Sequence, residues 1–245
     1  MIPVYPSNTF PNHISLVTGL LPKHHGIVNN RFYDKSRPAK DGYAKYKLGY
    51  GRMDSTWITA TPFWNLVEYH GMKAATFFWP ESDARISGAQ PSYFFHYSKY
   101  ADYQQRIDQI IHWLKLPEGA RPRFIAGYFS LTDTVGHDEG PFSEKTHHAV
   151  QNVDALIGQL HQRIKALNLP VNLVVVSDHG MRSADTRVDL RAVLARGDVD
   201  ATVIGTGTKI DDQVMIGHNC SIGPHNAFAS QVGIGGSTST GAYVR

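Results

Sequence analysis

The sequence contains a single cysteine, Cys220, among 245 residues. One cysteine excludes an internal disulfide and a cysteine-based metal knot. Long hydrophobic runs are also missing, and no stretch approaches the length of a transmembrane helix, so we expect no membrane span. The opening "MIPVYPSNTF" lacks the basic region and the apolar run of a signal peptide, and the sequence alone leaves the location of the protein open.

The sequence also lacks a marked excess of positive or negative charge. The formal net charge is +3, and no cluster of Lys and Arg stands out along the chain. We therefore expect no nucleic-acid partner. A hydrophobic content of 42% and a charged content of 18% are typical of an ordinary globular protein. Histidine, by contrast, is abundant, with 13 residues, which makes a His/Asp metal site plausible.

Strand-like and helix-like periodicities alternate up to about residue 195. Helices are predicted at "TPFWNLVEYHG", at "YQQRIDQIIHWL" and over residues 143–168, and buried strands at "KAATFFW", "RFIAGYFS" and "VNLVVVSDHG". Strands separated by helices indicate βαβ units, so we predict an α/β fold with a mostly parallel sheet covered on both faces. Chemistry in such sheets gathers at the carboxyl ends of the strands.

The pattern changes near residue 197, where aliphatic or similar residues begin to recur every six positions. The repeat runs through Ile204, Ile210, Ile216, Ile222, Phe228, Ile234 and Thr240. This period is typical of the hexapeptide repeats of a parallel β-helix. We therefore predict two domains, an α/β domain at 1–196 and a β-helix segment at 197–245.

The stretch "NTFPNH" places Thr9 at the start of a predicted short helix. Thr9 would be its N-cap and Pro11 would lie in the first turn, where a missing N–H costs nothing. A hydroxyl in that place also lies where free backbone N–H groups and the helix dipole attract a phosphate. The local pattern leaves both interpretations open, a helix cap and an attacking nucleophile.

Two pairs of Asp and His follow the predicted strands. Asp133 and His137 are four residues apart in "TDTVGHDEGP", and Asp178 and His179 are adjacent in "SDHGM". Such pairs can each bind one metal ion. A hydroxyl at a helix N-terminus together with two Asp/His pairs is what a two-zinc phosphoryl-transfer site needs.

The segments "YPSNTFPNHISLVTGLLPKHHGIVNNRFYD", "TDTVGHDEGP" and "VVVSDHGM" resemble the nucleotide pyrophosphatase/phosphodiesterase family of the alkaline phosphatase superfamily, over residues 1 to about 190. The resemblance implies that Thr9 is the nucleophile and forms a covalent intermediate. It implies that Asn30 donates a hydrogen bond to a nonbridging phosphate oxygen and that Phe10 lines the slot that stacks a nucleobase or other leaving-group moiety. Two zinc ions are implied, one held by Asp178 and His179 next to Thr9, the other by Asp133 and His137.

Two ligands of that family have no counterpart in this sequence. One is an aspartate on a strand well upstream of the threonine, and the other is a histidine far downstream of "DHG". Each zinc is therefore expected to be one ligand short, and the α/β sheet is expected to lack its first strand. Composition alone offers substitutes, namely His13, His24, His25, His147, His148 and His225.

The tail resembles the hexapeptide domain of the UDP-3-O-acylglucosamine N-acyltransferases of lipid A synthesis, which is a left-handed parallel β-helix. The likeness covers about the last 45 residues. It implies that His218, in "IGHN", is the general base that deprotonates an acceptor amine, and that the tail forms trimers.

Three functions follow from these likenesses. The first is a zinc-dependent hydrolase of phosphodiester or pyrophosphate bonds, acting on small nucleotide-type substrates and, as is usual in its family, outside the cytoplasm. The second is an N-acyltransferase-like module that uses His218. The third is a catalytically inactive fusion of two truncated genes.

Overall fold

The computed structural model describes residues 2–40, 42–183, 203–210, 214–216, 220–229, 232–235 and 238–244. The chain divides into two compact units, Met1–Ser183 and Ala184–Arg245. The predicted domain boundary after residue 196 falls outside the described residues and stays a prediction. No helix of the described residues is long and apolar enough to cross a membrane.

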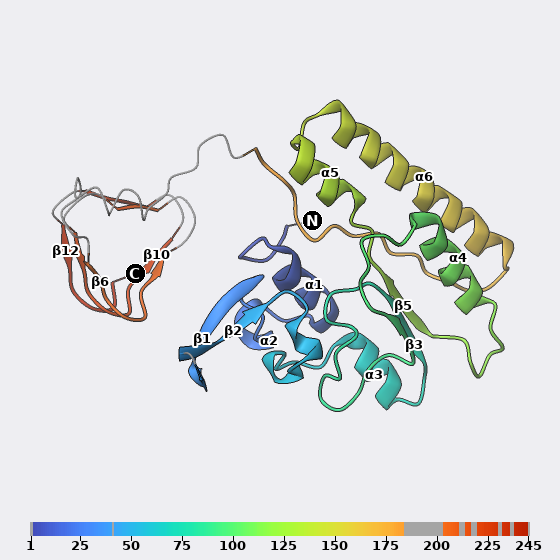
Figure 1. Ribbon diagram of the computed structural model, residues 1–245, viewed down its shortest axis with the longest axis horizontal. Coiled ribbons are helices and arrows are strands. Elements are labelled where there is room, and N and C mark those ends of the chain that lie inside the picture. Colours follow the sequence, from blue (N-terminus) through green and yellow to red (C-terminus); the bar gives the residue numbers. More distant parts are fainter. Residues whose placement is uncertain are drawn as a thin grey trace. The chain divides into compact units, whose positions relative to one another are not determined.

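A three-stranded parallel sheet forms the centre of the first unit (Figure 1). Its strands are β3 (Ala74–Phe77), β4 (Tyr93–Phe95) and β5 (Phe124–Gly127), in the order β4-β3-β5. Both neighbours pair with β3 in parallel. The strands expected at "KAATFFW" and "RFIAGYFS" are thus confirmed, and the predicted parallel arrangement is confirmed with them.

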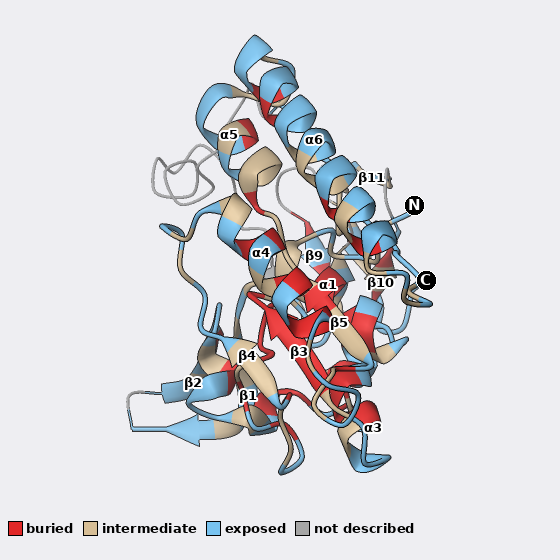
Figure 2. Ribbon diagram, turned by 90° about the vertical axis from the view of Figure 1, so that its right-hand side faces the viewer, coloured by how far each residue is buried: buried red, intermediate tan, exposed pale blue. Residues whose placement is uncertain are grey.

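Helices pack on both faces of this sheet because the side chains of β3 alternate between two hydrophobic clusters. Ala74 belongs to a cluster with residues of α1 (Thr9–Thr18) and α3 (Phe63–Tyr69). Ala75 and Phe77 belong to another cluster, with residues of α4 (Tyr103–Leu114) and α6 (Glu144–Ala166). Every residue of β3 is buried, as the red strand in Figure 2 shows. Strand β3 is therefore covered by helices on both faces of the sheet.

Helix α1 runs from Thr9 to Thr18, and it corrects the expectation that Thr9 is the N-cap. Asn8 is the N-cap, with extended backbone dihedrals, and Thr9 is the first helical residue. The helix ends at Gly19, whose φ of 69° allows its N–H to bond to the Ser15 carbonyl. The Thr9 hydroxyl is therefore not used as a cap.

An antiparallel hairpin follows α1 and the short helix α2 (Pro22–His25). It consists of β1 (Arg31–Ala39) and β2 (Gly42–Lys47), followed by the 3-10 turns η1 (Tyr50–Arg52) and η2 (Ser55–Trp57). Phe32, Tyr46 and Trp57 form an aromatic cluster with ring centroids 5.0 to 5.6 Å apart. This cluster fixes one face of the hairpin to the core.

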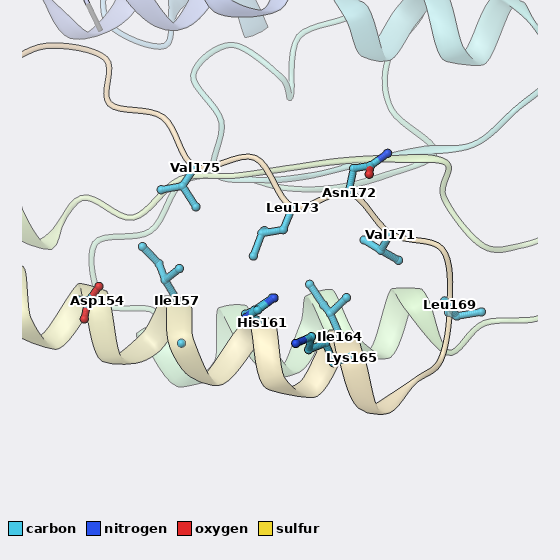
Figure 3. Close-up of a pocket in the computed structure, with 11 residues that line it drawn as sticks. Asp154, Ile157, His161, Ile164, Lys165, Leu169, Val171, Asn172, Leu173 and Val175 are labelled. Carbon is cyan, nitrogen blue, oxygen red and sulfur yellow. The ribbon is translucent and has the colours of Figure 1, made fainter.

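The strand expected at "VNLVVV" does not form. After α6, residues 171–176 run without strand pairing, and Val174 and Val175 are 76% and 60% exposed. Side chains of the segment face Ile157 and Ile164 of α6 across an open groove of about 620 Å³ (Figure 3). Within the described residues, no backbone hydrogen bond joins the segment to β5, which is why the sheet ends at β5.

The second unit consists of two-residue strands that recur every six residues. They are β6 (Val203–Ile204), β7 (Lys209–Ile210), β8 (Met215–Ile216), β9 (Ser221–Ile222), β10 (Ala227–Phe228), β11 (Gly233–Ile234) and β12 (Ser239–Thr240). Each pairs in parallel with a strand 18 residues along the chain, as β6 with β9 and β9 with β12. The six-residue repeat of the sequence is therefore the spacing of successive strands, and each strand pairs with the third strand after or before it.

The core of the second unit contains Cys220, Ile222 and Phe228. Beside it, Asn226 is buried and donates hydrogen bonds to Gly223, Thr240 and Gly241. A Cβ atom at Gly223 would overlap the carbonyl oxygen of Gly241, which explains why glycine follows the aliphatic residue at this position. His218, the predicted acyltransferase base, lies outside the described residues.

Candidate active site

Thr9 and His179 meet although 170 residues separate them in the chain. The Thr9 hydroxyl oxygen lies 3.2 Å from His179 Nε2. His179 Nδ1 lies 2.8 Å from the Gly180 carbonyl, which can only accept, so the ring proton belongs on Nδ1. Nε2 then carries a lone pair directed at the hydroxyl group, and Thr9 donates to it.

Asp178 lies beside the same two groups. Its Oδ2 is 3.2 Å from His179 Nε2 and 3.3 Å from Nδ1 of His13, one helical turn after Thr9. His13 Nδ1 also lies 2.8 Å from the Thr9 carbonyl. The buried His13 ring is held edge-on by Trp79 and Tyr128, with centroids 4.9 and 4.7 Å away. Burial lowers the pKa of His13, although the Asp178 charge opposes this effect.

Asn30 is fixed at the N-terminus of α1. Its Oδ1 accepts a hydrogen bond of 2.9 Å from the Phe10 N–H, so its Nδ2 is the group left to donate. This contact narrows the expectation of free N–H groups at the helix start, because the Phe10 N–H is engaged and Pro11 has none. The ring of Phe10 is partly buried and packs against the cluster around Ile14. An anion at this helix start would meet the Asn30 amide.

Asp133 and His137 lie one turn apart on α5 (Leu131–Glu139), with Asp133 Oδ1 3.5 Å from His137 Nε2. They therefore follow a predicted strand, as expected, and lie on a helix. Burial chiefly raises the pKa of Tyr128, and the charges of Asp133 and Asp178 raise it further. The carboxylates of Asp133 and Asp178 are therefore both close enough to the Tyr128 hydroxyl group to affect it. The two Asp/His pairs thus lie in the same region of the first unit.

The donor atoms suit zinc by their chemistry. Thr9 Oγ1, Asp178 Oδ2 and His179 Nε2 are oxygen and nitrogen ligands that converge on one place. Asp133 Oδ1 is buried and has no hydrogen-bond partner among the described residues. Such an unsatisfied oxygen is free to coordinate a metal ion. Among those residues, no three His, Cys, Asp or Glu side chains gather closely enough to hold a metal ion. Each site therefore offers two such ligands.

Of the six histidines suggested as substitute ligands, His13 is the only one with a contact to a predicted zinc ligand among the described residues. His25 is buried and bonds to Ser15 and Ile27, and burial lowers its pKa to about 4. His24, His147 and His148 are exposed, and His225 stacks on Tyr243 in the second unit. Composition alone could not select His13, but its spacing of four from Thr9 on a helix could have.

Comparison with known proteins places this chain in a family. Residues 1–229 match the family described as type I phosphodiesterase/nucleotide pyrophosphatase. The chain belongs to this family, and the match extends beyond the limit of about 190 expected from the sequence. An alkaline-phosphatase-like α/β fold is supported by solved relatives.

Human ectonucleotide pyrophosphatase/phosphodiesterase family member 1 is 39% identical over 189 residues, which are 76% of this chain and 20% of that protein. Venom phosphodiesterase 2 of Crotalus adamanteus is 38% identical over 185 residues, which are 73% of this chain and 22% of that protein. This chain thus spans about a fifth of the length of these relatives.

Among solved structures, murine ectonucleotide pyrophosphatase/phosphodiesterase 5 matches with a TM-score of 0.59 and 28% identity. The match covers 68% of this chain and 43% of that one. That structure is of an inactive Thr-to-Ala variant in complex with AMP.

Proposed function

We propose that this protein hydrolyses phosphodiester or pyrophosphate bonds of nucleotide-type substrates through a covalent intermediate on Thr9. The observation that carries the proposal is that three polar atoms converge at the start of α1. His179 Nε2 lies 3.2 Å from Thr9 Oγ1 and 3.2 Å from Asp178 Oδ2. Membership of the family supports the reaction class, and the AMP complex of the murine relative supports a nucleotide as substrate.

Zinc ions would be held by Asp178 and His179, together with Thr9, and by Asp133 and His137. When bound, they would lower the pKa of the nucleophilic hydroxyl and balance charge on the phosphoryl oxygens. The two-ligand pairs fit such ions by donor type, and His13 holds the carboxylate of Asp178 in place.

The reaction has two displacements at phosphorus. Thr9 Oγ1 attacks, so that an oxygen–phosphorus bond forms, the bond to the leaving oxygen breaks, and the hydroxyl proton passes to water. Water then attacks the phosphorus of the nucleotidyl-threonine ester, the bond to Thr9 Oγ1 breaks, and a nucleoside monophosphate is released as the hydroxyl is restored. Asn30 Nδ2 is placed to donate to a phosphate oxygen as its charge develops. The exposed part of Phe10 offers a planar surface to the adjoining group.

The test is the zinc-dependent release of a nucleoside monophosphate from a chromogenic nucleotide phosphodiester. The protein freed of metal and reloaded with zinc should show turnover, and the Thr9→Ala variant should show none above background. Turnover by Thr9→Ala equal to that of the unaltered protein would contradict the proposal. Folded, zinc-loaded protein without turnover would instead favour the inactive fusion.

For the second unit, we propose a short parallel β-helix with three hexapeptides per coil. The pairing of strands 18 residues apart, on three separate ladders, supports this architecture. The acyltransferase activity of His218, the left-handed sense of the coil and the trimer stay predictions, and no observation on the described residues favours that second activity.

A further inference from the structure

A connection of three residues, 128–130, joins β5 to α5. Helix α5 carries Asp133 and His137, which we call the α5 pair. The helix buries little of itself, because a single glycine is its only buried residue. The connection begins at Tyr128, whose N–H bonds to the Phe77 carbonyl of β3. The place where α5 presents its pair therefore depends on how residues 128–130 are held.

Two side chains of α4 contact all three residues of this connection. Arg106 Nη1 donates a hydrogen bond of 2.6 Å to the Tyr128 carbonyl, and the guanidinium lies 5.9 Å from the centre of the Phe129 ring. Tyr103 stacks on Phe129 with centroids 6.0 Å apart, and its hydroxyl oxygen lies 3.2 Å from that of Ser130. Ser130 is buried and is the N-cap residue of α5. A spacing of three residues places Tyr103 and Arg106 on one side of α4.

Arg106 is an unusual residue to find in a core. Its side chain is 1% exposed, and no carboxylate forms an ion pair with it within the described part of the protein. The guanidinium lies over the rings of Tyr103 and Phe78, at 4.2 and 4.8 Å, and its second hydrogen bond goes to the Ala101 carbonyl. A buried cation without an anionic partner costs folding free energy that an apolar side chain of similar volume would not. Packing alone therefore does not explain an arginine here.

We propose that Arg106 is a positioning residue of the proposed reaction, whose hydrogen bond to the Tyr128 carbonyl fixes the place where α5 presents its pair to zinc. The proposal rests on the proposed function, because zinc at the α5 pair is part of that function. Arg106 acts through the main chain of the connection and contacts neither candidate ligand of the α5 pair. A methionine in its place would fill much of the same space but would leave the carbonyl without its donor.

The test measures zinc affinity by competition with a chromophoric chelator in two full-length backgrounds. Asp178→Asn/His179→Ala keeps only the α5 pair. Asp133→Asn/His137→Ala keeps only the other predicted pair. We expect Arg106→Met to weaken zinc binding by about 10- to 100-fold in the first background and to change it little in the second.

A conservative variant and a control separate positioning from folding. Arg106→Lys keeps a cationic donor that can reach one carbonyl, so it should recover most of the affinity that Arg106→Met loses. Ile111→Ala removes apolar volume from a buried residue of the same helix but removes no hydrogen-bond donor. This control should lower the thermal midpoint of unfolding and leave the zinc affinity unchanged in both backgrounds.

Hydrogen exchange of the zinc-free protein gives a readout that needs no metal. Amides of α5, Leu131–Glu139, should exchange at least about tenfold faster in Arg106→Met and at the unaltered rate in Ile111→Ala.

Four results would overturn the proposal: equal weakening of zinc binding in both backgrounds, no zinc binding by the α5 pair, Arg106→Lys as weak as Arg106→Met, or unchanged exchange of α5. Neither assay needs turnover. A protein that gives the expected affinities and exchange rates but fails to hydrolyse the diester would therefore refute the proposed function and leave the role of Arg106 standing.

Discussion

His13 Nδ1 lies 3.3 Å from Asp178 Oδ2 and 2.8 Å from the carbonyl oxygen of Thr9. Both neighbours are acceptors, so Nδ1 carries the ring proton and points between them. One buried side chain thus ties the backbone of the proposed nucleophile to the carboxylate of a proposed zinc ligand. The positions of Thr9 and Asp178 therefore depend on each other.

Two substitutions of His13 distinguish the effect of its hydrogen-bond donor from the effect of its side-chain volume. Asparagine places an N–H donor at the position of His13 Nδ1, whereas leucine fills similar space without a donor. We expect His13→Leu to weaken zinc binding by about 10- to 100-fold and His13→Asn to retain most of it. Competition with a chromophoric chelator measures the affinity, and equal affinities of the two variants would contradict this role.

Asn30 is expected to act through its Nδ2 donor. In Asn30→Asp, an oxygen can still accept from the Phe10 N–H, but the donor toward phosphate becomes a carboxylate oxygen. We expect kcat for a chromogenic nucleotide phosphodiester to fall by about 100- to 1,000-fold, with little change in thermal stability. A variant of normal activity would exclude the amide from the reaction.

Glu81 should make the stability of the first unit depend on pH. Burial raises the pKa of its carboxyl to about 7, while Tyr46 and Gly49 donate hydrogen bonds to Oε1. Unfolded, the group titrates near about 4.3, so the unfolded state releases its proton first and stability falls as pH rises from about 4.3 through 7. The loss is a few kcal/mol in order of magnitude.

Glu81→Gln keeps the acceptor and removes the titration, so its stability should lack this decline. Tryptophan fluorescence in urea measures it, because all four tryptophans, Trp57, Trp64, Trp79 and Trp113, lie in the first unit. Glu118→Gln, at a side chain that is 80% exposed, serves as the control and should keep the profile of the unaltered protein. Parallel profiles for both variants would refute the assignment.

The second unit should tolerate a methyl group at Gly233 but not at Gly223. An added Cβ at Gly223 overlaps Gly241, whereas nothing lies within 4 Å of one at Gly233. We expect Gly223→Ala to destabilise the unit by about 1–3 kcal/mol. Hydrogen exchange of residues 203–244 by mass spectrometry measures the effect, and similar exchange in both variants would argue against close parallel stacking.

Local periodicity predicted much of this fold, because period alone specifies α4, α6 and the six-residue spacing of the tail. Segment 171–176 was predicted as a strand from its apolar run, but a strand also needs a paired edge, which composition cannot supply. The hairpin was not predicted, although "KDG" between alternating residues in 31–47 is a turn signal.

The site divides in the same way. Sequence motifs selected Thr9, Asn30 and the two Asp/His pairs as candidates, but contacts across 170 residues decide which groups meet. Thr9 was assigned to the cap, since its neighbours favour that reading; Asn8 takes that role and leaves the hydroxyl available. The role of His13 depends on tertiary packing by Trp79 and Tyr128.

The central claim is that Thr9 forms the covalent intermediate, and trapping this species tests it most directly. Zinc-loaded protein is quenched in acid during turnover of the chromogenic diester, digested with trypsin and analysed by mass spectrometry. The account predicts that the peptide Met1–Lys23 gains the mass of a nucleotidyl group at Thr9, which is a nucleoside monophosphate less one water, and that the adduct is absent from Thr9→Ala. Turnover without an adduct, or an adduct at another residue, would contradict it.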